Sequence, residues 1–460
     1  MNRTGPQPSR VPVRLQANDF LLAAEPCFQQ SLDEAAAIAN LSPSSHNCQP
    51  WGHVWLKSDR AKALAYELLH DPDDTTVGED SAGGADRTVG THRTVGTHRT
   101  GGTDSIYLAL AQDTDRSLGA LPAHSAEMHL SCGSYWHLLL RALAAQGWVP
   151  AAVRHVGLET LHRAAHRAAT DADWPHNWRL LSLAVLTRTG IPRSGDLADL
   201  ADRADLTELT ELTDRADLAE LAELRDTAAA RRTNRAPYRD LPVAPQALHE
   251  LAHLPPSSWD PNARTQVTVR HLRSPMELRR FATLIAHHAG RDFSDDAAWR
   301  ETHSYFRWTS QDAAARPDGF TAGQIFGPVS APRRLLARVA LNPAVLPHLC
   351  RLGFDRYLGS QLARTVRTTP VITAASLPMD APTTSDLLST GMWLADYWLT
   401  ATRAGLALHP LSILTQHEDL RIELQQRFGL PGRTFFVARL GYPTTTAAAT
   451  LRRRASSLTL

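Results

Sequence analysis

Residues 43–51, Pro-Ser-Ser-His-Asn-Cys-Gln-Pro-Trp, form the stretch that decides the fold we expect for this chain. Proline, small hydroxyl residues and side-chain amides are typical of a loop, and amides with free backbone N–H groups suit the polar edge of a flat heterocycle. Before it, a helix is predicted to start at Ser31, with Glu34 in capping-box spacing. After it, Val54-Trp55-Leu56 favours a strand. The alternative is an ordinary proline-bounded loop whose Trp51 packs in a core.

Composition narrows the class of protein. The 460 residues are 43% hydrophobic and 21% charged, enough for two or three globular domains. A net charge of +1 gives no electrostatic reason to expect nucleic acid or an anionic membrane as partner, so a small-molecule substrate fits better. Four distant cysteines without a C-x-x-C pair indicate neither a disulfide framework nor a zinc site. No signal-peptide pattern and no uncharged apolar stretch of about 18 residues occurs, so we expect a soluble, cytoplasmic protein.

Two segments of low complexity interrupt the chain. Residues 83–104 contain a repeated Arg-Thr-Val-Gly-Thr-His hexapeptide and predict a flexible surface insertion. Residues 196–227 carry an acid at every third position with leucines between. A three-residue repeat drifts by about 60° per repeat around a helix of 3.6 residues per turn, which predicts a helical connector without a fixed apolar face.

The remaining chain contains an internal repeat. Gly133 to Gly147 and Gly391 to Gly405 are apolar helical patterns with identical glycine spacing, each ending at a glycine as a C-terminal cap would. Each is followed by an apolar strand pattern, at 180–186 and at 435–440. Pro256-Ser257-Ser258 repeats the start of the loop at 43 but lacks its Asn, Gln and Trp. We therefore predict two copies of one α+β unit.

A basic cluster, Arg231-Arg232-Thr233-Asn234-Arg235, precedes the second copy. Guanidinium groups bind a phosphate dianion through paired hydrogen bonds, and hydroxyl or N–H groups add further contacts. A solvated basic helix end is the other interpretation of the same residues. The basic C-terminal run Arg452-Arg453-Arg454 could likewise belong to a site or to a disordered tail.

The loop at 43–51 and the arginine cluster resemble the flavin-binding motifs of the nitroreductase family of FMN oxidoreductases, and the whole pattern resembles its fused, two-copy Acg-type branch. The resemblance implies a nitroreductase-like α+β fold whose two tandem copies form an intramolecular pseudo-dimer within one chain, with a monomer among the expected states. The expected boundaries are a first unit at 1–195, the connector at 196–227 and a second unit at 228–460. Because family members build each flavin site from two subunits, one complete site is expected between the copies, and its twin has decayed.

The resemblance also implies the residues of that site. FMN is expected as cofactor, with NAD(P)H as a reductant, although the Glu that the family often has near residues 406–413 is absent. His46 is a candidate proton donor, with packing against the flanking helix as the alternative. The predicted cofactor-binding residues are Ser44, Ser45, Asn47, Gln49, Arg231, Arg232, Thr233, Arg235, Pro410, Leu411, Ser412, Arg452 and Arg454.

Three functions remain open at this stage. The first is an FMN-dependent reductase that transfers hydride through flavin N5 to a small organic acceptor. The second is an FMN-dependent oxidase or dehydrogenase that tailors a peptide or natural product, and the third is a flavin-binding protein without turnover. Aromatic residues gathered around Asp318-Gly319 predict either a lid over the flavin, within 299–345, or a small satellite core.

Overall fold

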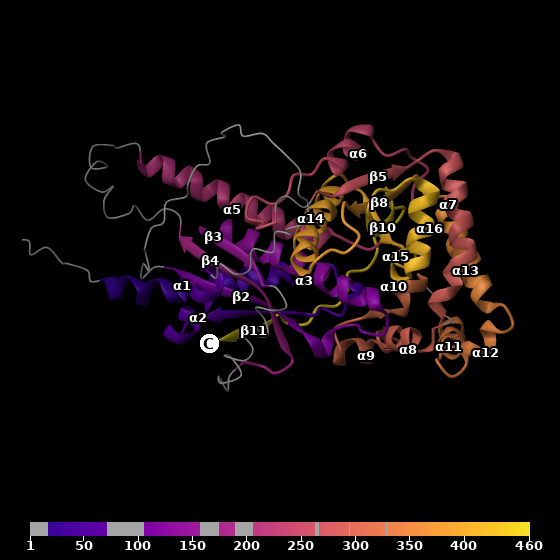
Figure 1. Ribbon diagram of the computed structural model, residues 1–460, viewed down its shortest axis with the longest axis horizontal. Coiled ribbons are helices and arrows are strands. Elements are labelled where there is room, and N and C mark those ends of the chain that lie inside the picture. Colours follow the sequence, from indigo (N-terminus) through magenta and orange to yellow (C-terminus); the bar gives the residue numbers. More distant parts are fainter. Residues whose placement is uncertain are drawn as a thin grey trace, which may run out of the picture.

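The computed structural model describes residues 17–70, 105–156, 174–188, 206–262, 266–293, 295–327 and 330–460. Within them, helices and strands build two large sheets with helices packed on both, besides a two-stranded sheet of β6 and β7, so the α+β class predicted from sequence is confirmed (Figure 1). The insertion predicted at 83–104 and the start of the predicted connector lie outside the described residues. None of the described helices is long and apolar enough to cross a membrane.

The first sheet has five strands in the order β11-β1-β2-β4-β3. Successive side chains of its strands point to opposite faces, so the sheet separates two hydrophobic cores. On β1, Trp51 and Trp55 face helices α1 and α3, whereas Val54 and Leu56 face α2. This part of the chain comprises α1 (Ala17–Ala39), β1 (Trp51–Leu56), α2 (Asp59–His70), β2 (Ile106–Asp113), α3 (Pro122–Ala144), β3 (Trp148–His155) and β4 (Trp178–Arg188).

The second sheet is antiparallel, with four strands in the order β5-β8-β10-β9. One face packs on α14 and α6, and the other on α7, α13 and α16. Its elements are α6 (Pro245–Ala252), β5 (Thr268–Leu272), α7 (Pro275–His288), α13 (Phe354–Arg367), β8 (Val371–Leu377), α14 (Thr384–Arg403), β9 (Ala407–Pro410), α15 (Ile413–Gln416), α16 (Glu418–Phe428) and β10 (Arg433–Gly441).

The long helices α3 and α14 lie side by side between the two sheets (Figure 1). A Cβ atom placed on Gly133 would lie 2.1 Å from the carbonyl oxygen of Leu388, and one placed on Gly391 would lie 2.3 Å from that of Leu130. Only glycine allows two helix backbones to approach this closely. Gly147 and Gly405, which follow the helices, both have positive φ, as expected of glycines that end a helix.

The C-terminal segment crosses from the second sheet to the first. Strand β11 (Ser456–Thr459) pairs in parallel with β1, from Gly52 opposite Ser456 to Trp55 opposite Thr459. The sequence analysis treated this end only as a basic tail, because four residues give too little periodicity to predict a strand. The last residues of the predicted second unit therefore belong spatially to the first.

Two sequence predictions about helices are wrong. Helix α1 begins at Ala17 and runs through Ser31, because Phe28, Leu32 and Ala35 continue one buried face across that position. The connector is helical over α5 (Leu206–Ala230), but its last turns do have a fixed apolar face. Leu221, Leu224 and Ala228 are buried in the first core, since their spacing of three and then four residues returns them to one side.

The region expected to be a lid or a satellite core contains a hydrophobic core of its own. Trp299, Phe306, Trp308, Phe320 and Leu346 pack together there. The elements involved are α8 (Asp296–Ser304), β6 (Phe306–Arg307), α9 (Ser310–Ala315), β7 (Phe320–Thr321), α10 (Ala322–Phe326), α11 (Ala331–Ala340) and α12 (Leu346–Cys350). A role as a lid stays a prediction.

Candidate functional site

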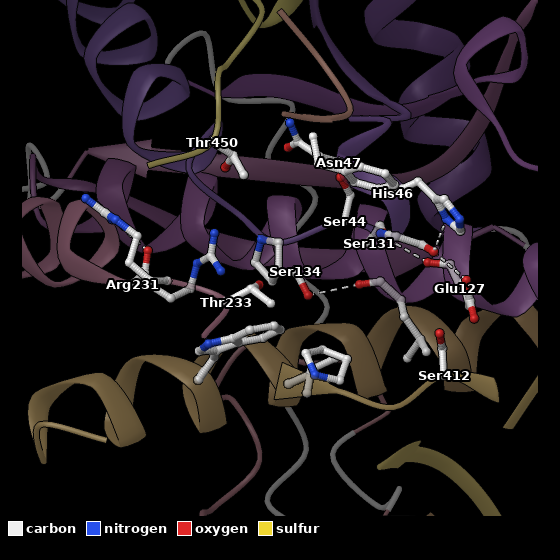
Figure 2. Close-up of a pocket in the computed structure, with 18 of the residues that line it drawn as sticks. Ser44, His46, Asn47, Glu127, Ser131, Ser134, Arg231, Thr233, Ser412 and Thr450 are labelled. Carbon is white, nitrogen blue, oxygen red and sulfur yellow. Dashed lines mark hydrogen bonds between the residues drawn. The ribbon is translucent and has the colours of Figure 1, made fainter. Parts of the chain in front are cut away.

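A pocket of about 310 Å³ lies between the two units, a size that suits a cofactor or small ligand. Eleven of the residues predicted from sequence line it together: Ser44, Ser45, His46, Asn47, Arg231, Arg232, Thr233, Arg235, Pro410, Ser412 and Arg452. Figure 2 shows Arg231 and Thr233 at one end, and His46 and Glu127 at the other. The loop at 43–51 and the arginine cluster at 231–235 are far apart in the sequence, and both line this one cavity.

The loop that brings Ser44, Ser45, His46 and Asn47 to the pocket has an unusual backbone. Ser45–Asn47 forms a single 3-10 turn, and His46, Asn47 and Gln49 have φ of 51°, 53° and 55°. Residues other than glycine rarely adopt this left-handed conformation, and such strain tends to gather at functional sites. The Ser44 hydroxyl stabilises the turn by accepting a hydrogen bond from the Gln49 N–H at 3.1 Å.

The side-chain amides of Asn47 and Gln49 are hydrogen-bonded to other parts of the chain, so their predicted contact with a flat ring stays a prediction. The Asn47 amide donates to the carbonyls of Gly319 and Leu451, and its oxygen accepts from Arg452 at 2.9 Å. Gln49 lies outside the pocket lining and is 1% exposed; its amide bonds Pro317 O and the N–H of Arg453. Both amides therefore hold the C-terminal segment and residues 317–319 against the loop.

Three arginines form one cationic end of the pocket. Arg231 and Arg452 both donate to the Leu41 carbonyl, at 3.1 and 3.2 Å, and Arg232 donates to Ala447 O at 3.2 Å. No carboxylate of the described residues pairs with any of the three. Burial, followed by the charges of Arg452 and Arg232, lowers the pKa of Arg231 well below its usual value. An anion at this end would relieve that mutual repulsion.

Arg235 stands apart from that cluster, although the sequence grouped it with Arg231 and Arg232. Its guanidinium carbon lies 5.8 Å from the centre of the Phe320 ring, and its charge helps to lower the pKa of His46 and of His409. Arg235 therefore belongs to the His46 end of the pocket. The sequence spacing could not separate Arg235 from Arg231 and Arg232. The chain turns after Thr233, which forms an isolated β-bridge with Leu408.

Two other predicted residues lie outside the pocket lining. Leu411 is 3% exposed in the second core, and its N–H donates to the Val437 carbonyl at 2.8 Å. That N–H is therefore not available to a ligand, whereas its neighbours Pro410 and Ser412 do line the pocket. Arg454 is exposed two residues beyond Arg452 and lies outside the pocket lining.

The predicted role of His46 as a proton donor stays a prediction, and the electrostatics around its imidazole do not favour it. Burial, followed by the charges of His124 and Arg235, lowers its pKa to about 3, so the imidazole is neutral near pH 7. Its Nδ1 lies 3.0 Å from Ser45 Oγ, and its Nε2 lies 3.1 Å from Thr302 Oγ1. Both ring nitrogens of His46 therefore have a hydroxyl partner through which a proton can pass, but the ring itself is not protonated near pH 7.

Glu127 of α3 is a functional candidate that the sequence analysis missed. Its Oε2 accepts from Ser45 Oγ at 2.5 Å and its Oε1 from Gln416 Nε2 at 2.9 Å, and it lines the pocket. Burial raises its pKa above the ordinary value. One signal was present in the sequence: Glu127 is the single acidic residue of the helix Pro122–Ala144. An isolated carboxyl in an apolar helix marks a candidate site.

Further lining residues were also missed. Leu394, Trp398, Phe435 and Phe436 form apolar walls, and Ser131 and Ser134 of α3 add hydroxyl groups. Their helical or strand periodicity is that of any core residue, so nothing in the sequence distinguishes them. The described residues contain no group of three or more His, Cys, Asp or Glu side chains that could hold a metal ion, and their four cysteines are free thiols.

Fold and pocket together define an α+β protein with a ligand site between two units, cationic at one end. No protein-family model matches the chain. The chain is, however, 28% identical over 426 residues to the probable NAD(P)H nitroreductase PigM of Serratia sp., an alignment that covers 93% of this chain and 92% of that protein. The chain is therefore similar over nearly its whole length to a nitroreductase, which confirms the resemblance that its motifs predicted.

Solved structures of nitroreductases are more distant relatives. The FMN-dependent nitroreductase NfnB of Mycobacterium smegmatis, solved with NADPH, shares 17% identity, covers 51% of this chain and 94% of its own, and gives a TM-score of 0.31. A putative nitroreductase of Anabaena variabilis shares 10% identity over 74% of this chain and 69% of its own, with a TM-score of 0.33. TM-scores this low carry no structural argument, so the similarity to nitroreductases rests on the Serratia protein.

Proposed function

We propose that the protein is an FMN-dependent oxidoreductase with one flavin site between its two units. The observation that carries the proposal is the cluster of Arg231, Arg232 and Arg452, three cations without a described carboxylate partner at one end of an apolar pocket. A ligand that combines a phosphate with a flat aromatic ring system has the complementary chemistry. The similarity to a nitroreductase makes FMN the cofactor of choice.

The residues present fit that cofactor. The Nε atom of Arg231 is buried without a hydrogen-bond partner among the described residues, which a phosphate oxygen would supply. Thr233 adds a hydroxyl at the same end. Leu394, Trp398 and Phe436 provide apolar surface for the ring system. When bound, the flavin supplies hydride transfer through its N5 atom.

Arg235 would then serve the ring end and not the phosphate. A cation near a flavin ring stabilises the negative charge of the reduced state, and this is a recognised way for a protein to tune flavin electronics. Ser412 at the turn before α15 has an N–H without a described acceptor, so it is a candidate donor to the ring edge. Leu411 cannot take that role, since its N–H is occupied.

We further propose that the two units are tandem copies that form an intramolecular pseudo-dimer, with the boundaries 1–195 and 228–460 on either side of the connector. The reciprocal approach of Gly133 to Leu388 and of Gly391 to Leu130 supports a two-fold relation, because each contact repeats the other with the copies exchanged. Each loop also contacts the equivalent serine of a long helix: Ser131 accepts from the Ser45 N–H, and Ser389 donates to Asp260.

The same relation supports a single flavin per chain. In the second loop Trp259 and Asp260 stand where the first has His46 and Asn47, and Trp259 packs against the first core. No arginine cluster like that at 231–235 occurs at the start of the described first unit. One site is therefore complete, and the other is not.

The reaction assigned to this site is hydride transfer to or from a small organic molecule, with NAD(P)H as reductant. The name of the Serratia relative, a probable NAD(P)H nitroreductase, supports a reductase of NAD(P)H type. The reverse direction, oxidation of a peptide or natural product, uses the same site, and flavin sequestration would use it without turnover.

Flavin released from the heated protein should approach one FMN per chain, and NADPH consumption by the yellow protein should rise with a nitroaromatic or quinone acceptor. Two flavins per chain, or a colourless protein that binds no FMN, would contradict the proposal.

A further inference from the structure

A continuous chain of hydrogen bonds runs from the pocket to helix α8. The first contact joins Glu127 Oε2 to Ser45 Oγ at 2.5 Å, and the second joins Ser45 Oγ to His46 Nδ1 at 3.0 Å. The third joins His46 Nε2 to Thr302 Oγ1 at 3.1 Å. Figure 2 shows the Glu127 and His46 side chains gathered at one end of the pocket. Thr302 is half-buried on the far side of His46, with exposed Ser304 two positions on, so the chain leads from the pocket toward solvent.

Two proton arrangements satisfy every link of this chain. With Glu127 protonated, its O–H donates to Ser45, the Ser45 hydroxyl donates to Nδ1 of His46, and the Nε2–H donates to Thr302. With Glu127 ionised, all three donors reverse: Ser45 donates to Glu127, Nδ1–H donates to Ser45, and Thr302 donates to Nε2. A change of one proton at Glu127 therefore switches the tautomer of His46 while His46 stays neutral.

Glu127 forms no salt bridge with an arginine or lysine of the described residues, which argues against a structural role as an ion pair. An enclosed carboxyl without a charged partner lowers stability unless it is neutral. In the second unit Ser385 faces the second loop through a 2.7 Å contact with Asn262, a neutral pair where the first unit places an acid. Titratable groups that are perturbed and aimed into a cleft are candidates for catalysis.

The charged and titratable neighbours of the relay come from several elements. Glu127 faces His124 of its own helix, Glu301 of α8 and Cys48 of the loop. His124 acts to lower the pKa of Glu127, and Glu301 acts to raise it, but burial is the larger effect and raises it. His46 faces Arg235 and His124, which both oppose a positive charge on its ring. The relay therefore conducts through a neutral imidazole.

We propose that Glu127 is the proton donor and acceptor of the pocket, and that Ser45 and His46 are positioning residues that connect it to Thr302. This inference rests on the oxidoreductase function proposed above. Reduction of an acceptor takes up one hydride and one proton. The hydride comes from the reduced flavin, Glu127 donates the proton to the oxygen or nitrogen of the acceptor, and Glu127 is left as a carboxylate. One proton from water then enters at Thr302, and the three reversed hydrogen bonds restore the protonated acid.

The first test needs no flavin and no turnover. Nitrogen-15 NMR of the full-length protein distinguishes the two neutral tautomers of histidine, and the signal of His46 is the one absent from a His46→Gln variant. We expect this signal to change between the two tautomers as pH is raised, and to become independent of pH in Glu127→Gln. A His46 signal that titrates identically in Glu127→Gln, or that never changes tautomer, overturns the relay.

The second test separates proton transfer from hydride transfer. Reduction of the bound flavin by NADPH needs a hydride but no proton from Glu127, whereas reduction of a quinone needs both. Glu127→Gln should leave flavin reduction within about twofold of wild type and slow quinone reduction by about 100-fold, a typical contribution of a general acid. The wild-type quinone rate should fall as pH rises through the raised pKa of Glu127, and the variant rate should not.

The controls use the outer end of the chain. Thr302→Val removes the last hydroxyl and should slow quinone reduction. Ser304→Ala removes an exposed hydroxyl of the same helix that bonds only the Glu301 carbonyl, and should not. Equal loss of both half-reactions in Glu127→Gln shows a structural role and overturns the inference. If the protein binds no flavin, the proposed function is contradicted instead. The NMR test of the relay can still be carried out in that case, because it needs no flavin.

Discussion

Gly133 and Gly391 face each other where helices α3 and α14 cross. An added Cβ on Gly391 would lie 3.0 Å from the Cα of Gly133 and 2.3 Å from the carbonyl oxygen of Leu130. The atoms in the way belong to the backbone, which cannot move aside as a flexible side chain can. Because Ser131, Ser134 and Leu394 of the same two helices line the pocket, this contact also sets the width of the site.

Gly391→Ala should therefore destabilise the protein and widen the pocket. Overpacking of this kind costs about 1–3 kcal/mol in the free energy of unfolding, so the thermal midpoint should fall and flavin binding should weaken with it. Gly119→Ala is the matched control, since nothing lies within 4 Å of an added Cβ at that exposed position. Equal stability of the two variants would contradict the close helix contact.

The Asn47 amide holds the C-terminal segment through Leu451 and Arg452, so its loss should free that segment. Loss of a hydrogen bond to a charged group costs about 1.5–3 kcal/mol, and local opening sets the rate of proteolysis. Asn47→Ala should therefore release the residues after Arg454 to trypsin about 10- to 100-fold faster than wild type, as followed by mass spectrometry. Asn262→Ala, in the second loop, should cleave at the wild-type rate. A wild-type rate for Asn47→Ala would show that the amide does not hold the tail.

Buried histidines should make the fold sensitive to mild acid. Burial lowers the pKa of His53 to about 4, against an ordinary value of 6.5. Above pH 6.5 the folded and unfolded states are both neutral at this group; between 6.5 and 4 only the unfolded state takes up the proton, so stability is lost as pH falls. At pH 5 this amounts to about 2 kcal/mol. His53→Gln should reduce the stability difference between pH 7 and pH 5 by that amount in urea unfolding, and an unchanged difference would contradict the assignment.

Sequence reasoning recovered the parts of this protein that depend on strong local patterns. The glycine-bounded helices, the apolar strands and the two motifs could be predicted because their residues are unusual in combination. It failed where contacts between distant parts of the chain determine what a side chain binds. Asn47 and Gln49 have the chemistry to bind a ring, yet they bind the C-terminal segment, whose position no local pattern reveals. The division between Arg235 and the other arginines also depends on a bridge between Thr233 and Leu408 that spans most of the second unit.

The central claim is that one end of the pocket binds a phosphate and the rest binds a ring, and variants of the arginines separate these two parts. Arg232→Ala and Arg452→Ala each remove a charge-assisted contact worth about 1.5–3 kcal/mol. Arg454→Ala removes the same type of side chain from an exposed position two residues beyond Arg452, outside the pocket, and should change nothing.

The most direct measurement is the affinity of each variant for FMN and for riboflavin, which lacks the phosphate. We predict that Arg232→Ala and Arg452→Ala weaken FMN binding by about 10- to 100-fold and leave riboflavin binding almost unchanged. The ratio of the two affinities cancels any general destabilisation. If both variants weaken FMN and riboflavin equally, the arginines only support the fold, and the site proposed between the two units is wrong.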